Sequence, residues 1–122
     1  MSQIMALFRT AGARVSSDRA KKANLAAVDA RDVLAKVATL PITTWNYISQ
    51  GPTVRHIGPM AQDFHATFGV GDDPTHINVV DAMGVILAAI QGLHQIVQEQ
   101  DARLAALEAR LAALEARDLQ RV

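Results

Sequence analysis

The chain has 122 residues, no cysteine and a formal net charge of zero, which fits one domain and excludes a disulfide framework and thiolate chemistry. Half of the residues are hydrophobic, but 22 are alanines that bury little area, so we expect part of the core to be shared between subunits. Residues 1–60 carry eight Lys/Arg against three Asp/Glu, and residues 61–122 carry four against nine. Because the acidic half would oppose a phosphate backbone, we expect no nucleic-acid partner. No uninterrupted apolar run approaches the ~20 residues of a membrane span, so we expect no membrane contact.

The first two thirds of the chain predict short elements of both kinds. After an irregular lead-in over residues 1–16, apolar residues three and four apart predict a helix within 28–40, which Pro41 ends. Residues 42–48 are β-branched and aromatic and predict a strand. A turn at 50–52 and a second short strand at 54–57 would complete a β-hairpin.

A short helix and a long one follow the hairpin. Gly58-Pro59 opens the short helix, along which Met60, Phe64 and Phe68 share one apolar face. A glycine-rich loop over 69–74 separates it from the last helix, for which Asp81 is the predicted cap. The predicted fold is therefore mainly α with a small β-hairpin (α+β), divided into 1–16, a body at 17–82 and a helix at 83–122.

The last helix carries heptads typical of a coiled coil. Apolar residues repeat at the a and d positions over more than four heptads, and one seven-residue segment is repeated identically. The a positions are Met83, Ile90, Val97, Leu104 and Leu111, and the d positions are Ile86, Leu93, Gln100, Leu107 and Leu114. The core of the coil is thus predicted to be Ile86, Ile90, Leu93, Val97, Leu104, Leu107, Leu111 and Leu114, with Gln100 as one polar layer that fixes register.

Charges beside this core favour parallel strands. The e positions hold Asp101, Glu108 and Glu115, and the g positions hold Arg103, Arg110 and Arg117. In a parallel coil each g arginine faces an e acid of the next heptad on the neighbouring chain, whereas antiparallel helices would pair like charges. The core residues themselves leave dimer and trimer open, since Ile90 and Val97 at a favour a dimer and Ile86 at d favours a trimer.

Three stretches resemble a known family. They are Ser17-Asp18-Arg19-Ala20-Lys21-Lys22-Ala23-Asn24-Leu25, Leu40-Pro41-Ile42-Thr43-Thr44-Trp45-Asn46-Tyr47, and Arg55-His56-Ile57-Gly58-Pro59-Met60-Ala61-Gln62-Asp63-Phe64. With the closing coil, they resemble the C-terminal intramolecular chaperone domain of phage tailspikes and tail fibres, the endosialidase type, over residues 17 to about 115. Trp45, His56, Gly58, Pro59, Gln62 and Asp63 carry the family motif.

The resemblance implies a homotrimer that aligns three chains of an upstream fibre and then cuts itself off. It makes residues 17–82 a chaperone and auto-processing body, residues 1–16 an upstream stub, and residues 83–122 the coil. It places the nucleophile at Ser17, the base at Lys22 and the cut between Ser16 and Ser17. Ser16 and Lys21 have the same spacing and form an alternative register. The short segment before Ser17 departs from the family pattern and leaves the client undefined.

The chemistry of such a dyad is demanding. A serine needs a base to take its proton, and a free lysine has a pKa of ~10.4 that burial or a neighbouring cation would lower. The simpler interpretation is that Ser17 caps a helical turn and Lys21-Lys22 form a solvated basic surface. Whether the chain is an enzyme, a single-turnover self-cleaving serine peptidase, is thus left open. The alternatives are a non-catalytic trimeric cap or, if the motifs are coincidental, an adaptor coiled coil.

The remaining expectations concern ligands and location. The four histidines lack metal-ligand spacing, so we expect no metal site and no cofactor. His56 is expected to be a hydrogen-bonded structural residue. The expected partners are further copies of the chain and the upstream fibre segment as client. The resemblance implies assembly in the bacterial cytoplasm and a destination in a phage virion or a prophage-derived particle.

Overall fold

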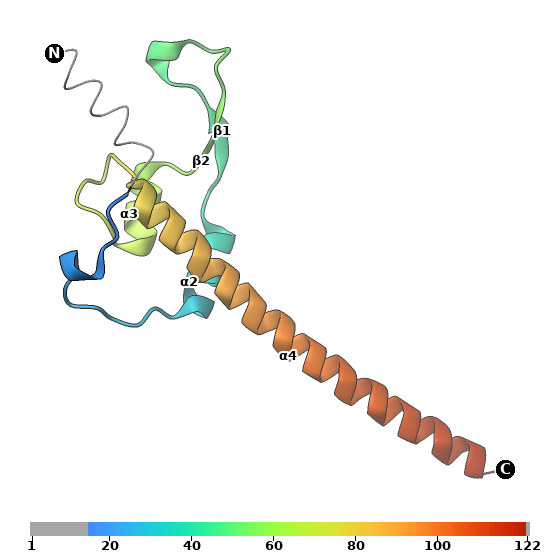
Figure 1. The fold of residues 1–122 in the computed structure, drawn as a ribbon. Helices are drawn as coiled ribbons and strands as arrows, with labels where there is room; N and C mark the ends of the chain where they lie inside the picture. The colour runs from blue at the N-terminus through green and yellow to red at the C-terminus, as the bar shows by residue number, and fades with distance from the viewer. Residues whose placement is uncertain (1–14, 122) are drawn as a thin grey trace.

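A computed structural model describes residues 15–121, which form a small mixed body on one end of a long helix (Figure 1). The elements in chain order are the 3-10 turn η1 (Arg19–Lys21), α2 (Ala30–Thr39), β1 (Thr43–Trp45), the 3-10 turn η2 (Ile48–Gln50), β2 (His56–Gly58), α3 (Ala61–Phe68) and α4 (Val79–Gln120). The prediction of a mainly helical chain with a small two-stranded sheet and a long C-terminal helix is confirmed. Most of the predicted stub, residues 1–14, lies outside the described residues.

Helix α2 packs along the first half of α4 and forms the main tertiary contact of the body. Asp29 caps α2 by accepting a hydrogen bond from the backbone N–H of Asp32 at 3.1 Å. The helix ends before Pro41, where the missing N–H and the ring of proline disfavour its continuation. Among residues 15–121, the buried apolar side chains are those of Ala30, Phe64 and Ala89, so the core of a single chain is small.

The β-hairpin is shorter in its pairing and longer in its loop than predicted. β1 and β2 are antiparallel, with Thr43 opposite Gly58, Thr44 opposite Ile57 and Trp45 opposite His56. Residues 46–55 form the connection, which contains η2 where the sequence predicted continued strand. The loop is held by Arg55, whose guanidinium donates to Asn46 Oδ1 at 3.1 Å and to Thr44 Oγ1 at 3.0 Å. Those side-chain bonds replace the backbone ladder that a longer strand pair would have made.

Helix α3 carries two of the three residues predicted to share its apolar face, and it begins at Ala61 rather than at Gly58-Pro59, because Gly58 still belongs to β2. Phe64 is 5% exposed, and its ring lies 5.0 Å from that of Phe68. Met60 precedes the helix as its N-cap residue and is more exposed than Phe64. Gly69 ends the helix in the left-handed conformation with φ of 61°, which a residue without Cβ adopts readily.

Helix α4 begins two residues before the predicted cap. Asn78 is the N-cap residue, and no side-chain hydrogen bond caps the helix there. Asp81 therefore lies inside the first turn, where its negative charge favours the positive end of the helix dipole. The prediction that Asp81 caps the helix was wrong, because the apolar residues Val79 and Val80 already belong to the helix.

Helix α4 is also the one helix among residues 15–121 that is long and apolar enough to cross a membrane by length and composition. An 18-residue window within Val79–Gln120 has a mean hydropathy of 1.5 and is 11% buried. The sequence analysis did not predict this stretch as apolar enough, because isolated polar residues such as Gln91 and His94 interrupt its apolar runs. Its hydropathy comes from two apolar faces, one packed on α2 and one formed by the a and d positions.

Candidate functional site

The serine and lysine proposed from the sequence, Ser17 and Lys22, are in contact across the short 3-10 turn η1. Lys22 Nζ donates a hydrogen bond to Ser17 Oγ at 2.6 Å. The turn is fixed by Asp18, whose Oδ1 accepts from the backbone N–H of Ala20 at 3.0 Å. The backbone N–H of Lys21 bonds Asp18 O at 3.0 Å, and that of Lys22 bonds Arg19 O at 3.2 Å. A spacing of five residues thus becomes a direct side-chain contact.

The geometry distinguishes the two registers. Among the side-chain hydrogen bonds of residues 15–121, the bond between Ser17 and Lys22 joins a serine to a lysine, and no such bond joins Ser16 to Lys21. A distance of 2.6 Å lies within the reach that a general base needs to take a hydroxyl proton. A neutral Lys22 in this position would be able to accept the hydroxyl proton of Ser17.

The dyad lies on an exposed segment of the single chain. Residues 15–29 are all exposed, and Asn24 takes a left-handed conformation with φ of 56° that turns the chain after Lys22. A lysine acts as a base only in its neutral form, and burial favours that form. A partner surface that covers this segment would supply the burial that one chain does not.

The motif residues of the hairpin form one aromatic cluster. The rings of Trp45 and Tyr47 lie 4.8 Å apart in an edge-on arrangement, and each lies 5.1 Å from the imidazole of His56. The indole of Trp45 donates to Gly58 O at 3.3 Å, and His56 Nε2 lies 2.8 Å from Gln50 Oε1. His56 is thus hydrogen-bonded within the hairpin, as expected for a structural histidine, and no contact joins it to Ser17.

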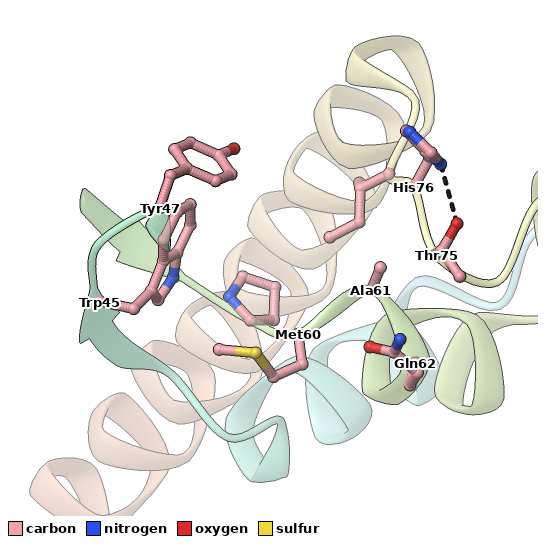
Figure 2. Close-up of a pocket in the computed structure, with 9 residues that line it drawn as sticks. Trp45, Tyr47, Met60, Ala61, Gln62, Thr75 and His76 are labelled. Carbon is pink, nitrogen blue, oxygen red and sulfur yellow. Dashed lines mark hydrogen bonds between the residues drawn. The ribbon is translucent and has the colours of Figure 1, made fainter. Parts of the chain in front are cut away.

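A groove opens between this cluster and the start of α3 (Figure 2). Its volume is about 480 Å³, and the lining residues are Trp45, Tyr47, Pro59, Met60, Ala61, Gln62, Thr75, His76 and Ile77. Three motif residues, Trp45, Pro59 and Gln62, thereby share one surface. Asp63, the remaining motif residue of α3, does not line the groove. Ser17 and Lys22 do not line it either, so the groove and the dyad are separate sites on the single chain.

Residues 73–76 lie across the groove from the hairpin, and the sequence predicted only a surface loop over 69–74 for part of this segment. Asp73 Oδ1 accepts hydrogen bonds from Thr75 Oγ1 at 2.6 Å and from the Thr75 backbone N–H at 2.8 Å, and Asp73 Oδ2 lies 2.8 Å from His76 Nδ1. The hydroxyl of Thr75, with its backbone N–H and His76, lowers the pKa of the Asp73 carboxyl. Asp-Pro-Thr is a typical turn sequence, which agrees with the loop predicted over 69–74.

The a and d side chains of α4 are exposed in the single chain. Ile86, Ile90, Leu93, Val97, Leu104, Leu107, Leu111 and Leu114 form one stripe and are each between 44% and 57% exposed. A stripe of this length on one helix face is the pattern by which helices associate. Among the residues that the structure describes, no group of three or more metal-ligating side chains is arranged to hold an ion.

One comparison with known proteins matches most of the body. Residues 17–70, a little under half of the chain, match the model of a peptidase family described as the chaperone of endosialidase. The match begins at Ser17 and includes the dyad, the hairpin and α3. The predicted resemblance to that family is therefore confirmed over these residues. A search of curated proteins found no match.

Proposed function

From the match of residues 17–70 to the chaperone of endosialidase, we propose that the chain is an intramolecular trimerisation chaperone for an upstream fibre or tailspike segment. Three copies associate in parallel through the a and d stripe of α4 and hold three client segments in register. Assembly takes place in the bacterial cytoplasm, and the client ends in a phage virion or a prophage-derived particle. The match is the observation that carries the chaperone role, and the exposed stripe supports the association.

The second part of the proposal is that the chaperone releases itself by cutting the Ser16–Ser17 bond. The observation that carries it is the 2.6 Å contact between Lys22 Nζ and Ser17 Oγ at the first residue of the family match. In this step a neutral Lys22 takes the hydroxyl proton while Ser17 Oγ attacks the carbonyl carbon of Ser16. The C–N bond to Ser17 breaks, and its nitrogen receives the proton. Water then hydrolyses the Ser16 ester, leaving a carboxylate on Ser16 and restoring the hydroxyl of Ser17.

In the proposed cleavage, the role of the trimer is to bury the dyad. Because the dyad is exposed in one chain, a neighbouring subunit that covers η1 would favour neutral Lys22 and hold Ser17 against its own peptide bond. Cleavage would then follow assembly, which suits a chaperone that must finish folding its client before it leaves.

The experiment is intact-mass spectrometry of the chain with a tag before Met1. Wild type should yield a product that begins at Ser17, and so should Ser16→Ala. Ser17→Ala and Lys22→Ala should stay whole, because one lacks the nucleophile and the other the base. A product that begins at Ser16 would instead support the register of Ser16 and Lys21.

Exposure of the dyad also favours a second candidate, a trimeric cap that does not cut. In that case Ser17 and Lys22 hold the 3-10 turn together as a hydrogen-bonded surface pair. A folded wild-type trimer that stays full length over days would support this candidate and exclude self-cleavage.

A further inference from the structure

Helices α2 and α4 approach each other closely at Gly92. A Cβ added to Gly92 would overlap the carbonyl oxygen of Ala30, lie 2.8 Å from the Ala30 carbonyl carbon and lie 3.1 Å from Leu34 Cβ. Real Cβ atoms do not approach backbone this closely, so only glycine allows α2 to sit at this depth. Gly92 itself is buried. The first turn of α2 therefore packs directly against the backbone of α4, and we call this contact between Ala30 and Gly92 the seat.

This seat is also where the dyad segment joins the body. Residues 15–29 are exposed, and Ala30 is the first buried residue after Lys22. Glu99 lies one heptad beyond Gly92. Its carboxylate accepts a hydrogen bond of 2.8 Å from the Arg31 guanidinium, so the two side chains form an ion pair. Ala30 and Arg31 thus fix the end of the segment that carries Ser17 and Lys22, and seven residues separate Lys22 from Ala30.

The seat lies on a different face of α4 from the predicted coil. Gly92 and Glu99 occupy c positions of the heptads, whereas the exposed stripe consists of a and d positions. A change at Gly92 can therefore move α2 without altering the residues through which α4 is proposed to associate.

We propose that Gly92 is a positioning residue for self-cleavage, which sets where α2 holds the dyad segment against the assembled coil. This inference rests on the proposed self-cleavage at Ser17. The helix that aligns the three chains thereby also fixes the place of the cutting segment, so assembly and cleavage share one element.

The test compares two glycines of the same helix. Gly92→Ala should keep the trimer but slow cleavage about tenfold or more, because a shift of α2 misplaces the dyad by ångströms. Gly84→Ala is the matched control, since its Cβ meets nothing within 4 Å and both changes raise helix propensity equally. It should leave assembly and cleavage unchanged. Sedimentation equilibrium gives the number of chains, and intact mass over time gives the rate within the trimer.

Hydrogen exchange at the amides of Lys21 and Lys22 reads the same coupling without cleavage. Both amides are hydrogen-bonded within η1, and Gly92→Ala should speed their exchange several-fold while Gly84→Ala should not. If wild type never cuts, the proposed self-cleavage fails, and this measurement still decides whether Gly92 fixes the place of η1. Normal cleavage by the Gly92→Ala trimer, or η1 exchange equal to wild type, would overturn the inference.

A charge exchange separates positioning from general loss of stability. Arg31→Glu and Glu99→Arg should each slow cleavage by about two- to fivefold, a modest effect because the pair is largely exposed. The double variant should recover the rate, since it restores the pair with reversed sign. Failure of the double variant to exceed either single variant would show that the ion pair plays no part in the seat.

Discussion

The ionisation of Asp73 is perturbed by its neighbours in the loop before α4. Its carboxylate accepts from the Thr75 hydroxyl at 2.6 Å, which favours the charged form and lowers the pKa. A lowered pKa means that the stabilisation of this turn is complete above the ordinary pKa of aspartate and is lost as pH falls through the lower folded value. Thr75→Val should therefore raise the Asp73 pKa toward its ordinary value, as measured by NMR titration. An unchanged pKa would show that the hydroxyl does not stabilise the carboxylate.

Phe64 is the aromatic residue on which the small body depends. It is 5% exposed and packs on Phe68, so Phe64→Ala should lower the free energy of unfolding by about 3 kcal/mol, measured in urea at fixed protein concentration. Met60→Ala is the control, because Met60 is 42% exposed and should cost about 1 kcal/mol. Equal losses for the two variants would contradict the burial described here.

At this scale the sequence predicted local contacts well and distant ones poorly. Ser17 and Lys22 are five residues apart, and one capped turn is enough to join them. Gly92 could not be selected, because its partner Ala30 is 62 positions earlier and a glycine in a helix carries no sign of which backbone approaches it. The bond from Trp45 to Gly58 escaped prediction for the same reason, since it depends on the hairpin register.

Among the elements, α4 was predicted from its heptads and the hairpin only in outline. Apolar residues at a and d positions repeat over many turns and so define the long helix. Each strand of the hairpin pairs over only three residues, which is too short to show the two-residue alternation of a strand. The start of α4 was missed because an acidic residue in the first turn and an acidic cap give similar sequence signals.

The stripe of α4 should be disrupted by one buried charge. In a parallel trimer, Leu107→Lys would bring three ammonium groups into one apolar layer, so the assembly should dissociate. Leu119→Lys is the matched control, because Leu119 lies at a b position and is 80% exposed. Sedimentation equilibrium should show monomers for the first variant and the wild-type assembly for the second. An intact Leu107→Lys assembly would place the interface elsewhere.

The direction of the helices can be tested through their charges. Arg110 at g should face Glu115 at e of a neighbouring chain, so Arg110→Glu should weaken the assembly by about 0.5 kcal/mol per pair. Adding Glu115→Arg should restore it, and both effects should fade at high salt. If the double variant dissociates as readily as the single one, the helices do not run parallel in this register.

The whole molecule divides into a small body and a long helix with an unpartnered stripe. One chain buries few apolar side chains, and the stripe offers the surface that further copies would cover. The same apolar content gives α4 the composition of a membrane span, but most of its exposed large apolar side chains lie at the a and d positions. We therefore retain association between chains as the proposed use of this face.

Native mass spectrometry of the purified chain, carrying a tag before Met1, can test trimerisation and self-cleavage together. One spectrum reports both the number of chains and the first residue of each chain. We expect three chains that each begin at Ser17, and a full-length trimer for Ser17→Ala under the same conditions. Monomers at every concentration would contradict the trimeric chaperone. A wild-type trimer of uncut chains would contradict self-cleavage by Ser17 and Lys22.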